Sequence, residues 1–276
     1  MAWFAGFVQL TLFGNICKSL FLLMLHSFGR FLGWIYKIWM ALYFAVSLTL
    51  LYPLFRLFLS KEAWFPKCFK LLRFWAWSIS VAGGYWLNIL HEDRASEQGP
   101  VVYCSNHHSY LDIVMMYRVL DQYFVFLGKS EIENWPLFNI FFTKGMNILV
   151  DRKSRSGAAR AYVRSKEEID KGHALAIFPE ATIPESAPKL IRFKDGAFKL
   201  AVEKQIPIVP ITYLDNWRLL SIGKKNPDRS GPGRCRVIVH KAIPTVGMTE
   251  DDVPKLRQQV FDLLAKTLSD HGRSQE

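Results

Sequence analysis

Two apolar segments fill the first 60 residues of this 276-residue chain, and they limit how it can fold. The first covers residues 3–28 and the second covers residues 31–59. Within the second segment, residues 38–55 carry no charge and approach the roughly 20 residues that cross a bilayer. The rest of a chain this short offers too little apolar surface to cover both segments. The sequence therefore predicts that the N-terminal part is seated in a membrane.

Gly29 and Arg30 separate the two segments, which predicts a helical hairpin over residues 1–60 and an α/β domain over residues 61–276. Polar residues at 9, 15 and 18 favour a first helix that lies in the interface or dips into one leaflet. Two full membrane spans, or a pair of buried core helices, are the alternatives. A cleaved signal peptide is disfavoured because no basic stretch precedes the apolar run.

Four basic residues follow the second apolar segment directly: Lys61, Lys67, Lys70 and Arg73. A cluster of this kind suits the anionic cytoplasmic face of the inner membrane, which is the expected location. Residues 63–80 also carry aromatic rings beside these charges, as interfacial helices do, although a core helix has a similar pattern.

The formal net charge of +11 indicates an anionic partner or, alternatively, lysines kept for solubility. A phospholipid surface, a phosphorylated substrate and an acidic carrier protein all fit this charge. Nucleic acid is disfavoured because no basic run lies within a recognisable binding module. The four cysteines are scattered without metal-ligand spacing, so we expect reduced thiols and no metal site or cofactor.

Beyond residue 84 the pattern changes to short apolar strands that alternate with helices, which is typical of an α/β fold. The expected sheet is mostly parallel or mixed and is flanked by helices. Strands are expected over residues 85–90, 101–104, 123–127, 147–150, 174–178, 207–213 and 236–240, and helices over residues 109–120, 154–171 and 194–204, with a last helix capped by Thr249.

Residues 106–112, Asn-His-His-Ser-Tyr-Leu-Asp, follow one of these strands. Ligands of α/β proteins bind at the carboxyl ends of strands. His107 and Asp112 converge there only if His107 precedes the helix, because five residues on an ideal helix diverge by about 140°. The pair is then a general base with its orienting carboxylate. No serine lies in a nucleophile elbow, so the activated hydroxyl belongs to the substrate. A structural histidine beside an aspartate is the alternative, and the spacing alone does not exclude it.

Three more segments place chemistry at strand ends. Residues 145–152 end in Arg152, which is suited to gripping a phosphate or, alternatively, to pairing with Asp151. Residues 178–182 carry Glu180 after a strand that Pro179 stops. Residues 206–211 form an apolar run between prolines, which fits either an acyl groove or an ordinary core strand.

In this order, the four segments resemble the four sequence blocks of the glycerolipid acyltransferase family, in particular its bacterial 1-acyl-sn-glycerol-3-phosphate acyltransferases. The first block resembles Asn-His-x-Ser-x-x-Asp, the second a Gly-to-Asp-Arg segment, the third Phe-Pro-Glu-Gly-Thr-Arg and the fourth an apolar stretch with proline. Residues 129–131 with 135–136 resemble the connector of the family, and residues 193–197 resemble the segment after its third block. The likeness covers roughly residues 65–245.

This resemblance implies transfer of a fatty acyl group from acyl-CoA or acyl-ACP to the sn-2 hydroxyl of a lysophosphatidic acid, giving phosphatidic acid for phospholipid biosynthesis. It makes His107 the base and Asp112 its partner. It places the acceptor phosphate on Arg152 and Lys129, and it has Glu180 position the acceptor or the loop around it. It also implies substrate-binding roles for a further set of residues, which comprises Asn106, Ser109, Thr182 and Arg192.

Two departures from the third block bear on the acceptor. Ala181 replaces the usual glycine, which stiffens the turn or needs φ below zero. Ile183 replaces the usual arginine, which removes one expected phosphate contact unless Lys189, Arg192 or Lys194 supplies it. An acyltransferase for another lysolipid, such as an ornithine lipid, is therefore the alternative function. A non-catalytic, basic membrane-binding protein is a third reading.

Overall fold

The structure is a computed structural model of the chain. It describes residues 2–93, 99–151, 154–221 and 230–272, and for residues 2–22, 25 and 26 it describes the backbone alone.

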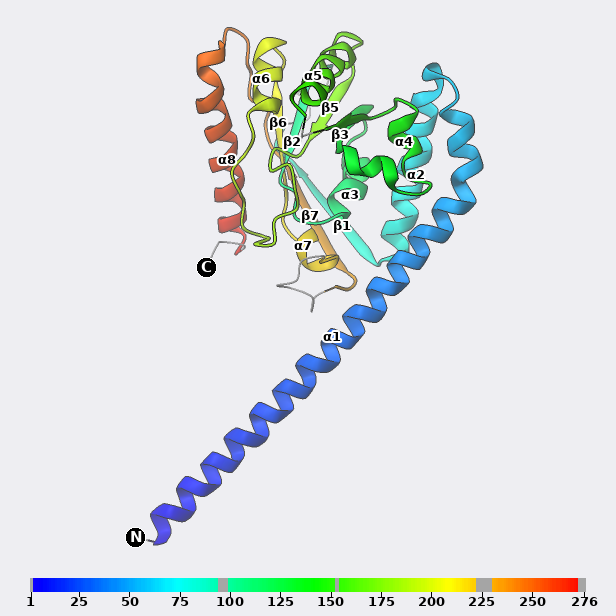
Figure 1. The fold of residues 1–276 in the computed structure, drawn as a ribbon. Helices are drawn as coiled ribbons and strands as arrows, with labels where there is room; N and C mark the ends of the chain where they lie inside the picture. Colours follow the sequence, from blue (N-terminus) through cyan, green and yellow to red (C-terminus); the bar gives the residue numbers. More distant parts are fainter. Residues whose placement is uncertain (1, 94–98, 152–153, 222–229, 273–276) are drawn as a thin grey trace.

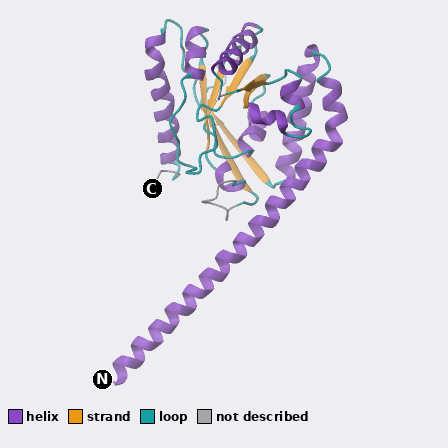
Figure 2. Cartoon of the chain, viewed as in Figure 1, coloured by secondary structure: helices purple, strands orange, loops and turns teal. Residues whose placement is uncertain are grey.

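A seven-stranded mixed sheet forms the centre of the molecule (Figures 1 and 2). Its strands are β1 (Tyr85–His91), β2 (Val102–Ser105), β3 (Phe124–Lys129), β4 (Ile148–Val150), β5 (Ala174–Ile177), β6 (Ile208–Tyr213) and β7 (Gly233–Val239). They lie in the order β1-β7-β6-β2-β5-β3-β4. All neighbouring pairs are parallel except β6 and β7. The expected α/β class with a mixed sheet is confirmed.

Helices cover both faces of this sheet (Figure 1). They are α1 (Ala2–Phe58), α2 (Phe65–Ala82), α3 (Leu111–Val119), α4 (Ile140–Thr143), α5 (Arg155–Asp170), α6 (Gly196–Glu203), α7 (Asn216–Leu219) and α8 (Val253–Asp270), with short 3-10 turns η1 (Glu62–Trp64), η3 (Ser130–Asn134) and η4 (Glu250–Asp252). One apolar core joins the sheet to α1, α2, α3 and α4, and a second joins it to α5, α6 and α8. The central strands β2, β5 and β6 are buried throughout because both faces are covered.

The expected strands and helices beyond residue 84 are all present, with ends that differ by at most three residues from those of the corresponding elements. Thr249 caps as expected: its side chain and that of Asp252 form a reciprocal capping box at the turn that leads into α8.

The N-terminal segment differs from its prediction, because α1 is one continuous helix with no turn at Gly29 and Arg30 (Figure 1). A glycine inside a helix costs only about 1 kcal/mol relative to alanine, so the long apolar sequence on both sides keeps the helix intact. The hairpin exists, but it is formed by α1 and α2 around η1. The expected division at residue 60 falls within this turn and separates two helices that pack together.

Packing explains which part of α1 contacts the domain. Met40, Leu48 and Phe55 recur at intervals of seven or eight residues and are buried against α2 and the sheet. Most of the other large apolar side chains in the described part of α1 are exposed, among them Leu23 and Leu57, while Tyr36, Phe44 and Leu51 are partly buried against the domain. Within the described residues, one helical stretch, Ser27–Phe58, is long and apolar enough to cross a membrane.

Candidate active site

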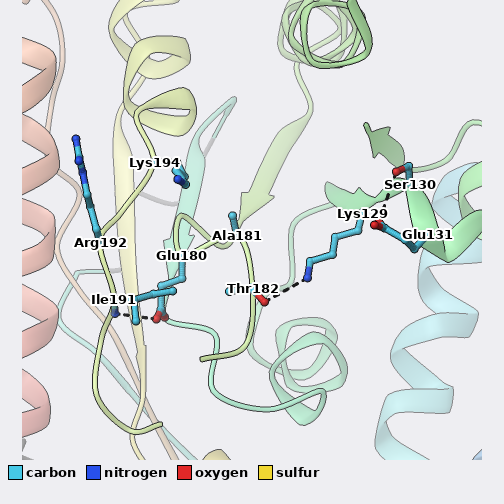
Figure 3. Close-up of a pocket in the computed structure, with 9 residues that line it drawn as sticks. All are labelled: Lys129, Ser130, Glu131, Glu180, Ala181, Thr182, Ile191, Arg192 and Lys194. Atoms are coloured by element: carbon cyan, nitrogen blue, oxygen red, sulfur yellow. Dashed lines mark hydrogen bonds between the residues drawn. The ribbon is translucent and has the colours of Figure 1, made fainter. Parts of the chain in front are cut away.

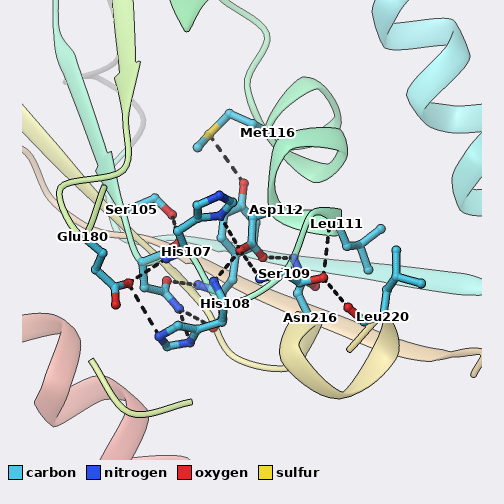
Figure 4. Close-up of polar contacts among 12 residues, drawn as sticks. Ser105, His107, His108, Ser109, Leu111, Asp112, Met116, Glu180, Asn216 and Leu220 are labelled. Carbon is cyan, nitrogen blue, oxygen red and sulfur yellow. Dashed lines mark hydrogen bonds and ion pairs between the residues drawn. The ribbon is translucent and has the colours of Figure 1, made fainter. Parts of the chain in front are cut away.

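The first and third sequence blocks meet at the carboxyl ends of β2 and β5, beside β6, to which the fourth block belongs. From β2 the chain passes beyond β5 to reach β3, whereas from β5 it passes beyond β2 to reach β6. Adjacent parallel strands whose connections leave in opposite directions open a crevice at their carboxyl ends. His107 follows β2, Glu180 follows β5 and Asn216 follows β6, so the topology brings three distant segments to one point (Figure 4).

The structure brings His107 and Asp112 together. Helix α3 begins at Leu111, so His107 lies in the turn before the helix, and its Nδ1 is 3.1 Å from Asp112 Oδ2. The imidazole stacks on the ring of Phe178, with centroids 4.0 Å apart. The His107 side chain keeps 12% of its surface exposed, and its Nε2 makes no hydrogen bond to any described residue. The ring is held in place and leaves Nε2 for a substrate.

Asp112 is fully buried, and donors surround its carboxylate. Oδ2 accepts the backbone N–H groups of His108 at 2.7 Å and Ser109 at 2.8 Å, in addition to facing His107 Nδ1. Oδ1 accepts the side-chain amide of Asn216 at 2.8 Å. Asp112 Oδ2 accepts hydrogen bonds from its other partners, so the hydrogen of the neutral His107 ring belongs on Nδ1, facing Oδ2. Nε2 then carries the free lone pair.

Asn216 belongs to this hydrogen-bond network, and the sequence reasoning missed it. It is fully buried at the start of α7, and its Oδ1 accepts the Cys235 thiol at 2.8 Å while its amide holds Asp112. No motif marked it, because Asn216 and Asp112 are 104 positions apart. The three described cysteines are unpaired thiols, as expected, and Cys235 contributes to this network.

The resemblance implies substrate-binding roles for Asn106 and Ser109. Both are fully buried. Asn106 exchanges two hydrogen bonds with the backbone of Tyr213 on β6, and Ser109 donates to the Leu220 carbonyl at 2.7 Å and accepts from Leu111 N–H. Their polar atoms form hydrogen bonds inside the protein, and these bonds support the turn.

Glu180 links the turn that carries His107 to Ile191, in the loop between the third block and residues 193–197. Its Oε1 accepts the backbone N–H of His107 at 2.8 Å, and its Oε2 accepts that of Ile191 at 3.2 Å. Burial raises the pKa of this carboxyl to about 8, although the two N–H groups oppose the rise. Nearby Asp112 adds to the rise, and burial beside Glu180 also raises the pKa of the Cys104 thiol.

A pocket of about 560 Å³ opens beside Glu180 (Figure 3). Its basic lining residues are Lys129, Arg192 and Lys194, and the Lys129 amine donates to Thr182 Oγ1 at 3.2 Å. Of the three cations considered as replacements for the missing arginine, Arg192 and Lys194 line the pocket and Lys189 does not. The pocket is therefore suited to an anionic group.

The turn after β5 corrects one expectation. Ala181 has φ of +63°, so it adopts the left-handed conformation that glycine favours, and φ is not below zero. The backbone N–H of Ala181 closes the turn on the Phe178 carbonyl at 3.0 Å. Alanine at this position therefore carries backbone strain that glycine would not. Arg152, expected to bind phosphate, lies outside the described residues.

Comparison with known proteins places this geometry in a family. Residues 87–214 match the family model described as Acyltransferase. The chain is 32% identical to human 1-acyl-sn-glycerol-3-phosphate acyltransferase alpha over 69% of its length. It is 30% identical to a Chlamydomonas reinhardtii protein with the same activity in its name, over 68% of its length. This chain belongs to the glycerolipid acyltransferase family.

The matches cover only part of each relative. The aligned part spans 56% of the algal relative and 66% of the human one, so the chain corresponds to somewhat over half of each. Among solved structures, the crystal structure of the 1-acyl-sn-glycerophosphate acyltransferase PlsC from Thermotoga maritima has the same fold. It has a TM-score of 0.71 at 18% identity, and the match covers 90% of this chain and 99% of the other.

Proposed function

We propose that this acyltransferase-family protein transfers a fatty acyl group from acyl-CoA or acyl-ACP to the sn-2 hydroxyl of 1-acyl-glycerol-3-phosphate. The observation that carries the proposal is the His107–Asp112 pair, held at 3.1 Å by buried contacts with Nε2 of the imidazole left open. The relatives named 1-acyl-sn-glycerol-3-phosphate acyltransferases support the choice of acceptor.

In the proposed reaction, His107 Nε2 removes the proton from the acceptor hydroxyl as its oxygen attacks the thioester carbonyl. The tetrahedral intermediate collapses, the carbon–sulfur bond breaks, and the imidazolium returns the proton to the departing thiolate. Asp112 keeps the proton on Nδ1 and stabilises the imidazolium. The products are the sn-2 ester and a free thiol, and the reaction as proposed needs no cofactor.

The acceptor phosphate is assigned to the pocket beside Glu180. Lys129, Arg192 and Lys194 line it, and none of the three pairs with an acid among the described residues. Some lysines and arginines elsewhere on the domain do have such partners, for example Lys204 with Asp170 and Arg236 with Asp215. The three cations outnumber the two carboxyls that line the same pocket, Glu131 and Glu180, and such an excess of positive charge attracts an anion. Arg192 and Lys194 thus stand in for the arginine that Ile183 displaces.

Membrane seating follows from the exposed apolar side of α1. Contiguous exposed apolar surface on this scale marks a membrane or protein contact, and α1 continues far beyond the α/β domain (Figure 1). Next to the site, the exposed rings of Tyr110 and Trp135 pack edge to face, and Trp135 leads through Phe138 to Phe44 of α1. Tyrosine and tryptophan at this position suit the headgroup level of a bilayer. We assign the bound leaflet to the cytoplasmic face, as the basic residues after α1 suggest.

An acceptor panel tests the proposal. Purified protein in vesicles receives a long-chain acyl-CoA or acyl-ACP with lysophosphatidic acid, with a lysolipid that lacks a phosphate monoester, or with a lyso-ornithine lipid. We expect transfer to lysophosphatidic acid with either donor. Transfer to the lyso-ornithine lipid alone would establish the alternative that Ile183 motivates, and transfer to no acceptor would leave the non-catalytic reading.

A further inference from the structure

His108 is buried beside the base, and the mechanism gives it no role. Its side chain keeps 1% of its surface exposed, and its Nε2 is a buried nitrogen without a hydrogen-bond partner. That nitrogen lies 3.6 Å from Glu180 Oε1, which is just beyond hydrogen-bond distance (Figure 4). An uncompensated polar atom in the interior is costly, so its position needs a reason.

The neighbours of His108 define which of its ring nitrogens carries the proton. Asn106 Oδ1 accepts the backbone N–H of Tyr213, which fixes the orientation of the Asn106 amide. The amide NH₂ then faces His108 Nδ1 at 3.0 Å and can only donate to it. Nδ1 is therefore the acceptor and Nε2 carries the hydrogen. Burial lowers the pKa of His108 to about 4, so the ring is neutral at physiological pH.

A neutral ring that carries its hydrogen on Nε2 points an N–H at Glu180. This carboxyl already accepts the N–H groups of His107 and Ile191, and a carboxylate accepts such bonds more strongly than a neutral acid does. The ionisable groups that act on Glu180 and His108 include His107, Asp112 and Cys104, and the pocket that Glu180 lines adds Lys129, Glu131, Arg192 and Lys194. Burial and Asp112 work against ionisation of Glu180, and a third N–H donor would favour it.

We propose that His108 is a positioning residue: its Nε2–H closes onto Glu180 Oε1 and keeps the carboxylate ionised, which ties the catalytic turn to Ile191 in the pocket wall. His108 does not touch the substrate and acts only through Glu180. Its effect on catalysis rests on the proposed function, whereas its effect on Glu180 does not.

Three variants separate donation from packing. His108→Leu has a similar volume and no donor. His108→Gln keeps an amide that reaches toward Glu180, and His108→Asn is polar but too short to do so. If His108→Leu does not fold, His108→Asn provides the same comparison with a polar side chain.

Thermal unfolding at pH 6 and pH 9 tests the contact without requiring activity. The hydrogen bond from His108 Nε2–H matters most when Glu180 is ionised. The drop in Tm relative to wild type should therefore be at least twice as large at pH 9 as at pH 6 in the Leu and Asn variants. The Gln variant should follow the wild type at both values. An equal loss at both pH values, or a Gln variant that behaves like Leu, would overturn the proposal.

The pH profile of kcat/KM then tests the consequence for acyl transfer. We expect the acidic limb of the profile to move up by about one pH unit in the Leu variant, because a tenfold change in the ionisation equilibrium of Glu180 corresponds to one unit. The Gln variant should restore it. If the wild type has no activity, the proposed function is refuted. The thermal-unfolding result then still tests the contact between His108 and Glu180.

Discussion

The side-chain amide of Asn216 donates to Asp112 Oδ1 at 2.8 Å, although the two residues are 104 positions apart. One residue opens helix α7 after β6, and the other lies in the first turn of α3 after β2. The bond therefore exists only because β2 and β6 are neighbours in the sheet. It leaves Oδ2 to face His107, so that a remote amide fixes the orientation of the carboxylate.

Asn216→Ala should lower kcat by about tenfold or more, since a buried group left without its partner costs about 1–3 kcal/mol. The reason is that Asp112 Oδ1 and the Cys235 thiol both lose a partner. Steady-state kinetics with saturating acceptor provides the measurement. Asn139→Ala is the control, because this side-chain amide also donates one hydrogen bond, to the Glu133 carbonyl, and none to Asp112 among the described contacts. An unchanged kcat for the Asn216 variant would show that the carboxylate needs no such support.

Ala181→Gly should raise stability by about 0.5–1 kcal/mol, because relief of the left-handed strain exceeds the extra entropy of glycine in the unfolded chain. At φ of +63°, Ala181 is strained in a way that glycine is not. Calorimetry should show an increase in Tm of roughly 2–4 °C for a chain of this size at the upper end of that range. Ala159→Gly, at an exposed position inside α5, is the matched control and should lower the Tm. A lower Tm for Ala181→Gly would refute the strain argument.

Arg192→Ala combined with Lys194→Ala should raise KM for lysophosphatidic acid by about tenfold at low salt, since hydrogen bonds to charged groups contribute about 1.5–3 kcal/mol. kcat should change much less, because neither residue contacts His107 among the described contacts. Lys189→Ala removes a cation from the same loop without altering the lining of the pocket, and should leave KM unchanged. Equal effects of the two variants would indicate general electrostatic attraction and no defined phosphate site.

A fluorescent probe can locate the membrane-facing side of α1. In a Cys17→Ser background, Leu42→Cys places a reactive thiol on the exposed face of α1, where Leu42 is 58% exposed. In vesicles, a probe at this position should shift to shorter wavelength and be quenched by brominated lipid chains. Val163→Cys on α5 lies on the other side of the sheet and should retain the spectrum of a probe in water. If the two probes behave alike, α1 does not face lipid.

Local sequence signals predicted most of the fold. Alternation of short apolar strands with polar helices indicated every strand, and the position of His107 before a helix indicated that it could meet Asp112. Both signals are local and concern neighbours in the chain. The prediction of a turn at Gly29 was wrong, because a helix tolerates a glycine when a long apolar sequence continues on both sides.

Long-range contacts could not be predicted in the same way. The roles of Asn216 and His108 depend on which strands are adjacent, and the burial of Asn106 and Ser109 depends on β6 and α7 closing over the turn. The strain at Ala181 belongs to the backbone and is invisible in the composition of the turn. These features required the three-dimensional arrangement.

The central claim is that His107 is the base that activates the acceptor hydroxyl. Its most direct measurement is the rate of acyl transfer to lysophosphatidic acid in vesicles by wild type and by His107→Ala, at saturating donor and acceptor. We predict that kcat falls by at least about 10²–10⁴, the range that a positioned general base contributes, while the variant still binds the acceptor. A His107→Ala protein that transfers acyl groups at the wild-type rate would contradict the mechanism.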